Sequence, residues 1–305
     1  MKHLLSIEAL SAADIARIIA LADRLKAERG HHTAQPLAGQ SWGLIFAKSS
    51  TRTRISFEVG IRELGGDVMF LSAADIQLGR GELIRDTARV MGRLLGGAVI
   101  RTFAQADVVE FAEFSRIPTI NALTDDEHPC QILADLQTIK EKLGDYSGRK
   151  VCFIGDGACN VARSWIWAAA RCDFQLTIAA PANYQPDPAL LQAVNSPNIR
   201  VTADPVEAAH GAEVLYTDVW VSMGKEDEAA FRLAQLASYQ VNSHLVAAAA
   251  PGALVMHCLP AYREKEITGD VFEAHAQTIF DEAENRLHAQ KAVLSLLADG
   301  WASHG

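Results

Sequence analysis

A run of hydroxyl and guanidinium side chains, Ser-Thr-Arg-Thr-Arg, occupies residues 50–54, between an apolar segment and a helical pattern. The first turn of a helix presents unpaired N–H groups and a partial positive charge, which favour an oxyanion. Ser50, Thr51 and Thr53 add hydroxyl donors, and Arg52 adds a planar fork that matches phosphate oxygens bidentately. Such residues also serve as ordinary helix caps and surface charges, but their alternation over the whole run favours an anion site.

A second polar segment, His128-Pro-Cys-Gln131, also stands directly before a helical pattern, with a proline suited to the first turn. Arg101 lies near the carboxyl end of a predicted strand. Open parallel sheets bind ligands at the carboxyl ends of their strands, so we expect His128, Gln131 and Arg101 to face one cleft. A capping histidine and a surface salt bridge are the structural alternatives.

Two later segments suggest further chemistry. Asp218-Val-Trp-Val-Ser-Met-Gly224 places a carboxylate at a strand end, where it could bind a cationic amine; an ordinary acidic loop is the alternative. His257-Cys-Leu-Pro260 invites a cysteine nucleophile with a histidine base. Adjacent strand residues point to opposite faces, so His257 is poorly placed as a base for Cys258. The spacing shows no metal triad, and we expect no metal.

Gly155-Asp-Gly157 follows a predicted strand and has part of a dinucleotide-binding fingerprint. The third glycine is missing, and the next predicted strand, at 176–180, does not end in an acidic residue. A nicotinamide-dependent dehydrogenase is therefore the weaker interpretation, and we expect no cofactor.

These segments must be positioned by alternating strands and helices. A first helix begins at Ser11 with a Ser-x-x-Asp capping box. Strands are then predicted at 42–47, 68–71, 98–103 and 118–122, with helices at 52–64, 83–95, 106–114 and 131–143. After a hinge candidate at 144–148, strands are predicted at 150–154, 176–180, 199–202, 213–219 and 254–258. Helices are predicted at 160–171 and 188–194, and a further short helix is predicted to end at His210.

This alternation predicts parallel sheets with helices on both faces. We expect an α/β protein of two domains, at 1–144 and 148–280, with an active site in the interdomain cleft. The last helix is predicted at about 281–297. We expect this C-terminal segment, 281–305, to pack back on the first domain.

Composition narrows the class of protein. The chain has 305 residues, 49% of them hydrophobic, and a net charge of −9. This length suits two domains, and the apolar fraction excludes a disordered chain. The acidic balance argues against non-specific nucleic-acid binding. We see no signal peptide, no membrane span and no disulfide framework among five cysteines. We therefore expect a cytoplasmic protein.

The four polar segments together resemble the aspartate/ornithine carbamoyltransferase family. Residues 50–54 and 128–131 look like motifs that both branches share, whereas 218–224 and 257–260 resemble the ornithine branch. Stretches at 75–82 and 282–288 also match, in unchanged order along nearly the whole chain. The resemblance implies transfer of the carbamoyl group of carbamoyl phosphate to the side-chain amine of L-ornithine. The products would be L-citrulline and phosphate, with no covalent enzyme intermediate.

The resemblance also implies two sets of site residues. The carbamoyl phosphate set is Ser50, Thr51, Arg52, Thr53, Arg101, His128 and Gln131, with Cys258, Leu259 and Arg286 completing the pocket and Gln77 reaching it from a neighbouring subunit of a homotrimer. The ornithine set is Leu123, Asn160, Asp218, Ser222 and Met223. The catalytic residues would be Arg52, Thr53, Arg101 and His128, which stabilise the oxyanion and the leaving phosphate, together with Cys258.

One segment departs from the family pattern. The family usually shows Gly-Asp-Gly-Asn-Asn, whereas this chain reads Gly-Asp-Gly-Ala-Cys-Asn160, one residue longer. Asn160 matches the second asparagine only if the extra residue is looped out. This keeps a carbamoyltransferase for another amine, such as putrescine or an N-acylornithine, as an alternative. A non-catalytic binding homologue is disfavoured because the segments at 50–54 and 128–131 are intact. The sequence does not distinguish arginine synthesis from arginine breakdown.

Overall fold

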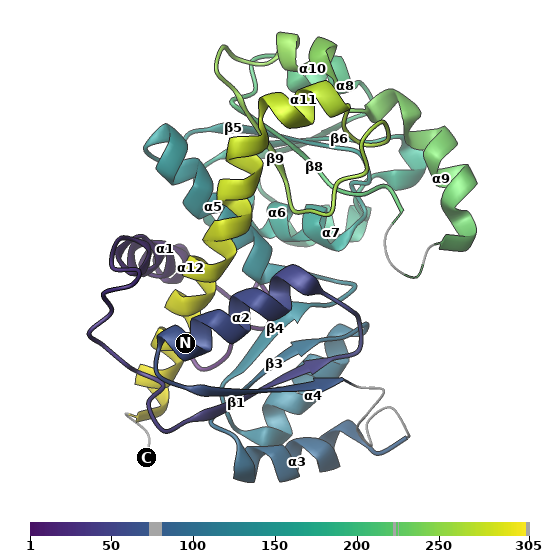
Figure 1. Cartoon of the computed structure of the whole chain (residues 1–305). Coiled ribbons are helices and arrows are strands. Elements are labelled where there is room, and N and C mark those ends of the chain that lie inside the picture. The colour runs from purple at the N-terminus through teal and green to yellow at the C-terminus, as the bar shows by residue number, and fades with distance from the viewer. Residues whose placement is uncertain (73–80, 222–223, 225, 303–305) are drawn as a thin grey trace. The chain divides into compact units, whose positions relative to one another are not determined.

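The computed structural model describes residues 1–72, 81–221, 224 and 226–302, and the chain divides into two compact units (Figure 1). Unit 1 comprises Met1–Gln137 and Glu284–Gly305, and unit 2 comprises Thr138–Ala283. Helices α5 (Pro129–Leu143) and α12 (Ala276–Ala302) carry the chain from one unit to the other. Within the described ranges, every helix is too short or too polar to cross a lipid bilayer.

Unit 1 contains a four-stranded parallel sheet in the order β2-β1-β3-β4. Its strands are β1 (Ser41–Phe46), β2 (Asp67–Ser72), β3 (Gly97–Arg101) and β4 (Thr119–Leu123). Its helices include α1 (Ala12–Ala27), α2 (Thr51–Glu63), α3 (Ile84–Leu94) and α4 (Gln105–Ser115). In Figure 1, α3 and α4 lie on one face of this sheet and α2 on the other. The predicted alternation of this region is confirmed, with small shifts at element ends.

Helix α1 shows how local sequence starts these elements. Its cap, Ser11, accepts a hydrogen bond from the backbone N–H of Asp14 (3.1 Å), and Asp14 accepts one from the backbone N–H of Ser11 (3.1 Å). The predicted capping box is therefore confirmed. Ile15, Ile18 and Ile19 then fall on one helical face and are buried, because their spacing matches the helical period.

Unit 2 contains a five-stranded parallel sheet in the order β7-β6-β5-β8-β9. Its strands are β5 (Lys150–Ile154), β6 (Gln175–Ala179), β7 (Ile199–Thr202), β8 (Val214–Thr217) and β9 (Leu254–His257). Helices α6 (Asn160–Arg171), α7 (Pro188–Val194) and α8 (Pro205–Ala209) are confirmed predictions. The two parallel-sheet units flanked by helices confirm the predicted fold class.

The structure also contains helices that the sequence analysis missed. These are α9 (Ala229–Leu236), α10 (Ser243–Ala248) and α11 (Gly269–Ala274), and α12 begins before its predicted start. The three missed helices are short, and one or two turns carry too few residues to show a clear 3.6-residue period.

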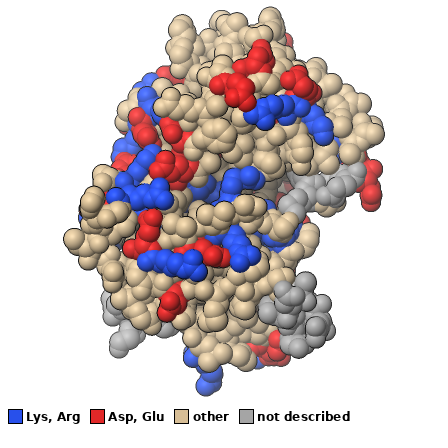
Figure 2. All heavy atoms as spheres, viewed as in Figure 1, with Lys and Arg blue, Asp and Glu red and all other residues tan. Residues whose placement is uncertain are grey.

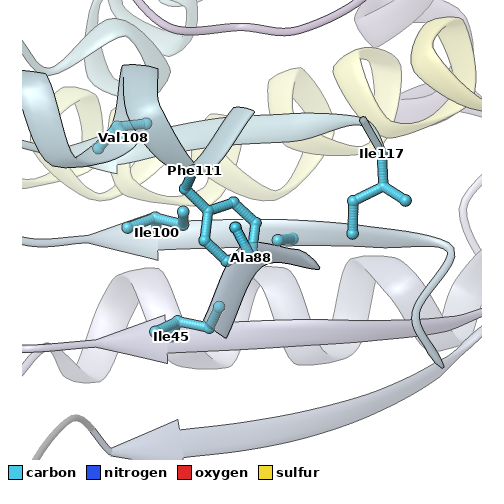
Figure 3. Packing of buried hydrophobic residues seen from close by; sticks show 7 residues of the cluster. Ile45, Ala88, Ile100, Val108, Phe111 and Ile117 are labelled. Carbon is cyan, nitrogen blue, oxygen red and sulfur yellow. The ribbon is translucent and has the colours of Figure 1, made fainter. Parts of the chain in front are cut away.

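A buried apolar cluster packs against the strands of the unit 1 sheet (Figure 3). It contains Ile45, Ala88, Ala98, Ile100, Val108, Phe111 and Ile117. Ile45 and Ile100 directly precede the last residues of β1 and β3, and burial of each such side chain contributes about 1.5–3 kcal/mol. Packing in this cluster therefore holds the strand ends, Phe46 and Arg101, from which the polar segments continue.

Acidic and basic side chains are interspersed on the face of the molecule shown in Figure 2. Ion pairs between neighbours on a helix are one source of this pattern; Arg54 Nε, for example, lies 2.7 Å from Glu58 Oε1. Such exposed pairs contribute little to stability. The charged side chains that bear on the candidate site are the buried ones.

Candidate active site

The hydroxyl and guanidinium run forms the turn between β1 and α2. Ser50 is the N-cap of α2, and its Oγ accepts a hydrogen bond from the backbone N–H of Thr53 (3.3 Å). Thr53 is buried in the first turn. Ser50 is therefore a helix cap, and the run also stands at a helix N-terminus, as an anion site requires.

Arg286 of α12 joins two of the predicted segments. Its Nη1 donates to Gln131 Oε1 (2.6 Å) and its Nη2 donates to Thr53 Oγ1 (3.2 Å). Gln131 Nε2 in turn donates to Asp135 Oδ1 (2.8 Å), one turn further along α5. A single buried guanidinium thus connects α2, α5 and α12. Asp135 was missed by the sequence analysis, although its position four residues after Gln131 was a usable signal.

His128 lies among the positive charges of unit 1 and is buried. Burial lowers the pKa of His128 well below its usual value, and the charges of Arg286, Arg101 and Arg52 lower it further. The imidazole is therefore neutral at pH 7. Residues from separate predicted segments therefore act on one another electrostatically, and this concentration of positive charge suits an anionic ligand.

Lys48 and Asp125 are further residues at this edge that the sequence analysis missed. The buried Lys48 ammonium group pairs with the Asp125 carboxylate and lies 4.3 Å from the centre of the Phe103 ring. The backbone N–H of Asp125 donates to the carbonyl oxygen of Phe103 (2.8 Å). These contacts join the segments that follow β1, β3 and β4. The place of Lys48, two residues before the Ser50 cap, was the available signal.

Asp218 and Cys258 lie side by side in unit 2, because they follow the paired strands β8 and β9. The Cys258 thiol donates to Asp218 Oδ1 (2.9 Å), and the backbone N–H of Val219 donates to the same oxygen (2.7 Å). Burial raises the pKa of Asp218, whereas these hydrogen bonds act in the opposite direction. The pair offers a carboxylate acceptor at the carboxyl end of the sheet.

His257 is committed elsewhere, as the strand geometry predicts. Its Nδ1 accepts a hydrogen bond from the backbone N–H of Leu259 (2.9 Å), so its Nε2 carries the proton that faces Glu266 Oε1 (3.2 Å). The ligand atoms of Asp218, His257 and Cys258 lie within 4.8 Å of one another. Both ring nitrogens of His257 are already hydrogen-bonded, so a metal ion would have to displace one of these bonds.

The lengthened segment before Asn160 forms a turn that leads into α6. Asp156 Oδ1 accepts a hydrogen bond from the backbone N–H of Ala158 (3.0 Å). Cys159 is the N-cap, and its Sγ accepts one from the backbone N–H of Ala162 (3.4 Å). Asn160 is thereby the first residue of the helix, at the same sheet edge as Asp218.

The partial dinucleotide fingerprint has a local explanation. A Cβ atom at position 157 would lie 2.7 Å from Ile178 Cγ2 of β6, so Gly157 is required for close packing. Gly155 has a φ of +130°, which a side chain would strain. Neither glycine therefore needs a dinucleotide to explain it.

The sequence-predicted residues thus fall into two groups. Unit 1 holds Ser50, Thr51, Arg52, Thr53, Arg101, Leu123, His128, Gln131 and Arg286, and unit 2 holds Asn160, Asp218, Cys258 and Leu259. Leu123 ends β4 opposite Arg101, so it lies with the anion-site residues. Gln77, Ser222 and Met223 lie outside the described residues.

Comparisons with known proteins agree with this two-part arrangement. Residues 2–141 match the carbamoyl-P binding domain of aspartate/ornithine carbamoyltransferases, and residues 147–297 match their Asp/Orn binding domain. An ornithine carbamoyltransferase from Akkermansia muciniphila is 60% identical over 98% of this chain and 99% of its own. An anabolic ornithine carbamoyltransferase from Pseudomonas aeruginosa is 48% identical over 98% of both.

Solved structures show the same likeness. The ornithine carbamoyltransferase from Pyrococcus furiosus superimposes with a TM-score of 0.91 at 41% identity, over 98% of this chain and 97% of that one. The anabolic enzyme from Campylobacter jejuni gives a TM-score of 0.93 at 39% identity, over 98% of this chain and 100% of that one. The chain therefore belongs to the aspartate/ornithine carbamoyltransferase family.

Proposed function

We propose that this protein transfers the carbamoyl group of carbamoyl phosphate to the side-chain amine of L-ornithine, giving L-citrulline and phosphate. The observation that carries the proposal is the charge arrangement of unit 1, where the charges of Arg286, Arg101 and Arg52 act together on the buried His128. The relatives that are similar over nearly the whole chain bear the name ornithine carbamoyltransferase. Two of them are named anabolic, and we extend the proposal to arginine synthesis.

Unit 1 would bind carbamoyl phosphate. Its guanidinium groups and the first turn of α2 would hold the phosphate and stabilise the charge that it gains as it leaves. Neutral His128 would hydrogen-bond the carbonyl oxygen as that oxygen becomes negative. Loss of one such preorganised donor typically costs about 3–4 kcal/mol of barrier. We retain Cys258 and Leu259 as additional carbamoyl phosphate residues on the basis of the family motif.

Unit 2 would bind most of the ornithine. The Asp218 carboxylate suits the α-ammonium group, and the first-turn position of Asn160 places an amide at the same strand ends. The neutral side-chain amine would attack the carbonyl carbon of carbamoyl phosphate, and the C–O bond to phosphate would break. The departing phosphate can accept the amine proton. The proposed chemistry requires no redox step and no added group.

We also propose that the protein works as a homotrimer in the cytoplasm. Unit 1 exposes Ile55, Met69, Leu83, Val90 and Leu94 on α2, β2 and the α3 region. Apolar side chains that are exposed in one contiguous patch, unlike single ones, are typical of surfaces that a partner covers, and these residues are the candidates for such a patch. Gln77 would reach the carbamoyl phosphate of a neighbouring subunit.

Citrulline formation with different amines tests the proposal. The purified protein should produce a carbamoylated product from carbamoyl phosphate and ornithine, with much lower kcat/KM for putrescine and N-acetylornithine. A higher kcat/KM for putrescine than for ornithine would contradict the proposed substrate and identify a carbamoyltransferase for another amine. Failure with every amine, in a protein that still binds carbamoyl phosphate, would favour a binding protein.

A further inference from the structure

A buried arginine of α9 joins three segments of unit 2. Arg232 Nε donates to the carbonyl oxygen of Trp220 (2.7 Å), and its Nη2 pairs with the Asp156 carboxylate. The guanidinium carbon lies 4.8 Å from the centre of the Tyr184 ring. The fourth contact is with the exposed Glu228, at 3.4 Å. Arg232 and Asp156 are only 7% and 6% exposed.

The partners of Arg232 flank the proposed ornithine residues. Asp156 lies in the turn that leads into Asn160. Its Oδ1, the oxygen that does not pair with Arg232, accepts a hydrogen bond from the backbone N–H of Ala158 in that turn. Trp220 follows Asp218 by two residues, and its indole nitrogen would lie 3.2 Å from a Cβ atom at Gly155. One guanidinium therefore holds together the two backbone segments that carry Asn160 and Asp218.

The charges explain why a cation is needed at this place. Burial raises the pKa of Asp156, the Arg232 charge lowers it, and the Asp218 charge raises it again. Two buried carboxylates thus lie within electrostatic range of each other. Arg232 compensates the Asp156 charge, so the Asp218 carboxylate remains the acceptor that is available to an ammonium group. A buried ion pair contributes little net stability on average, so the presence of the Arg232–Asp156 pair is better explained by a positional role.

We propose that Arg232 is a positioning residue that sets the spacing of Asn160 and Asp218 and thereby the affinity for the amino-acid substrate. This inference rests on the proposed function. Lysine cannot replace Arg232, since a single ammonium group lacks the planar fork that spans the Trp220 carbonyl and the Asp156 carboxylate.

Kinetics of Arg232→Lys and Asp156→Asn test the inference. In each variant the KM for ornithine should rise, by at least about tenfold in Arg232→Lys, which corresponds to about 1.4 kcal/mol. The kcat at saturating ornithine should change less than the KM. The Kd of carbamoyl phosphate, measured by calorimetry on the free enzyme, should stay within about twofold, because its proposed residues lie mainly in unit 1. A purely structural role would not separate these constants.

Arg149→Lys is the matched control. Arg149 also combines a carboxylate with backbone carbonyl oxygens: its Nη1 donates to Glu213 (2.6 Å) and its Nη2 to Leu143 (2.6 Å). It lies at the amino ends of β5 and β8, away from the strand ends that carry Asp218. Its ornithine KM should equal that of the wild type.

The outcomes separate the two claims. A wild-type protein that makes no citrulline would contradict the proposed function. An active wild type with an unchanged ornithine KM in folded Asp156→Asn and Arg232→Lys would contradict only the positioning role. An equal loss of carbamoyl phosphate binding would contradict it as well. If Arg232→Lys does not fold, Asp156→Asn decides alone, because the amide keeps the size of the side chain.

Discussion

At the scale of single residues, the two arginines of the 50–54 run have different surroundings. Arg54 donates to Glu58, and its guanidinium carbon lies 3.8 Å from the centre of the Phe70 ring. The Arg52 charge instead lowers the pKa of His128. The two residues therefore form a matched pair for testing the anion site.

Arg52→Ala should lower kcat by about 10²–10³-fold and weaken carbamoyl phosphate binding, because a charged donor to the phosphate and the oxyanion is lost. Arg54→Ala should stay close to the wild type. Steady-state rates and calorimetric titration with carbamoyl phosphate provide the measurement. Wild-type turnover in Arg52→Ala would refute the anion site.

His128 should make the protein sensitive to acid. Its pKa is lowered in the folded chain, so between that value and the ordinary 6.5 the unfolded chain binds more protons. The free energy of unfolding must then fall as the pH drops below about 6.5, by up to about 1.4 kcal/mol per pH unit. Urea unfolding near pH 7 and near pH 5 should show a smaller fall in His128→Gln. An identical fall in both proteins would count against a depressed His128 pKa.

Asp218 raises the question of which group limits the rate at low pH. A free alkylammonium has a pKa near about 10, so we expect kcat/KM for ornithine to rise from about pH 6 to about pH 8 as neutral amine becomes available. Burial raises the pKa of Asp218, so its own ionisation is the competing explanation. Asp218→Asn should weaken ornithine binding but keep the rising limb in a pH–rate profile. Loss of that limb would identify the aspartate as a base.

At the scale of elements, the start of α6 has an unusual cap. Cys159 accepts from the Ala162 N–H at 3.4 Å, and a thiol is a weak acceptor. Cys159→Ser should raise the free energy of unfolding by about 0.5–1 kcal/mol, because a hydroxyl is a preferred cap. Cys172→Ser, at the buried C-cap position of the same helix, is the contrasting control and should lower it. Urea unfolding measures both, and a destabilised Cys159→Ser would contradict the capping argument.

At the scale of the whole molecule, the family resemblance predicts a shared site. Gln77→Ala should impair carbamoyl phosphate use, although Gln77 lies outside the main motifs. Mixed oligomers of Gln77→Ala and Arg52→Ala subunits should recover part of the activity, since some sites would contain neither lesion. Each variant should carry a different affinity tag, and purification over both tags in turn verifies the hybrids. Verified hybrids without recovery would contradict the shared site.

The sequence by itself determined most elements and the place of each polar segment along them. The Ser11 cap, the buried face of α1 and the strand–helix alternation depend on residues within a few positions of one another. Local patterns of the same kind predicted that the segments 50–54 and 128–131 lie at helix starts. Short helices such as α9 were not predicted, because so few residues show no clear helical period of apolar positions.

Tertiary structure alone decided which of these residues meet. Arg286 bonds Thr53 across 233 positions and Gln131 across 155, and no local pattern contains that information. Likewise, the Cys258 thiol faces Asp218 and the His257 ring faces Glu266, although cysteine and histidine are neighbours in the chain. Contacts between distant segments depend on the order of the strands, which decides which segments become neighbours. They also depend on burial, because a buried polar group without a hydrogen bond costs free energy and therefore pairs with a partner that the fold places nearby.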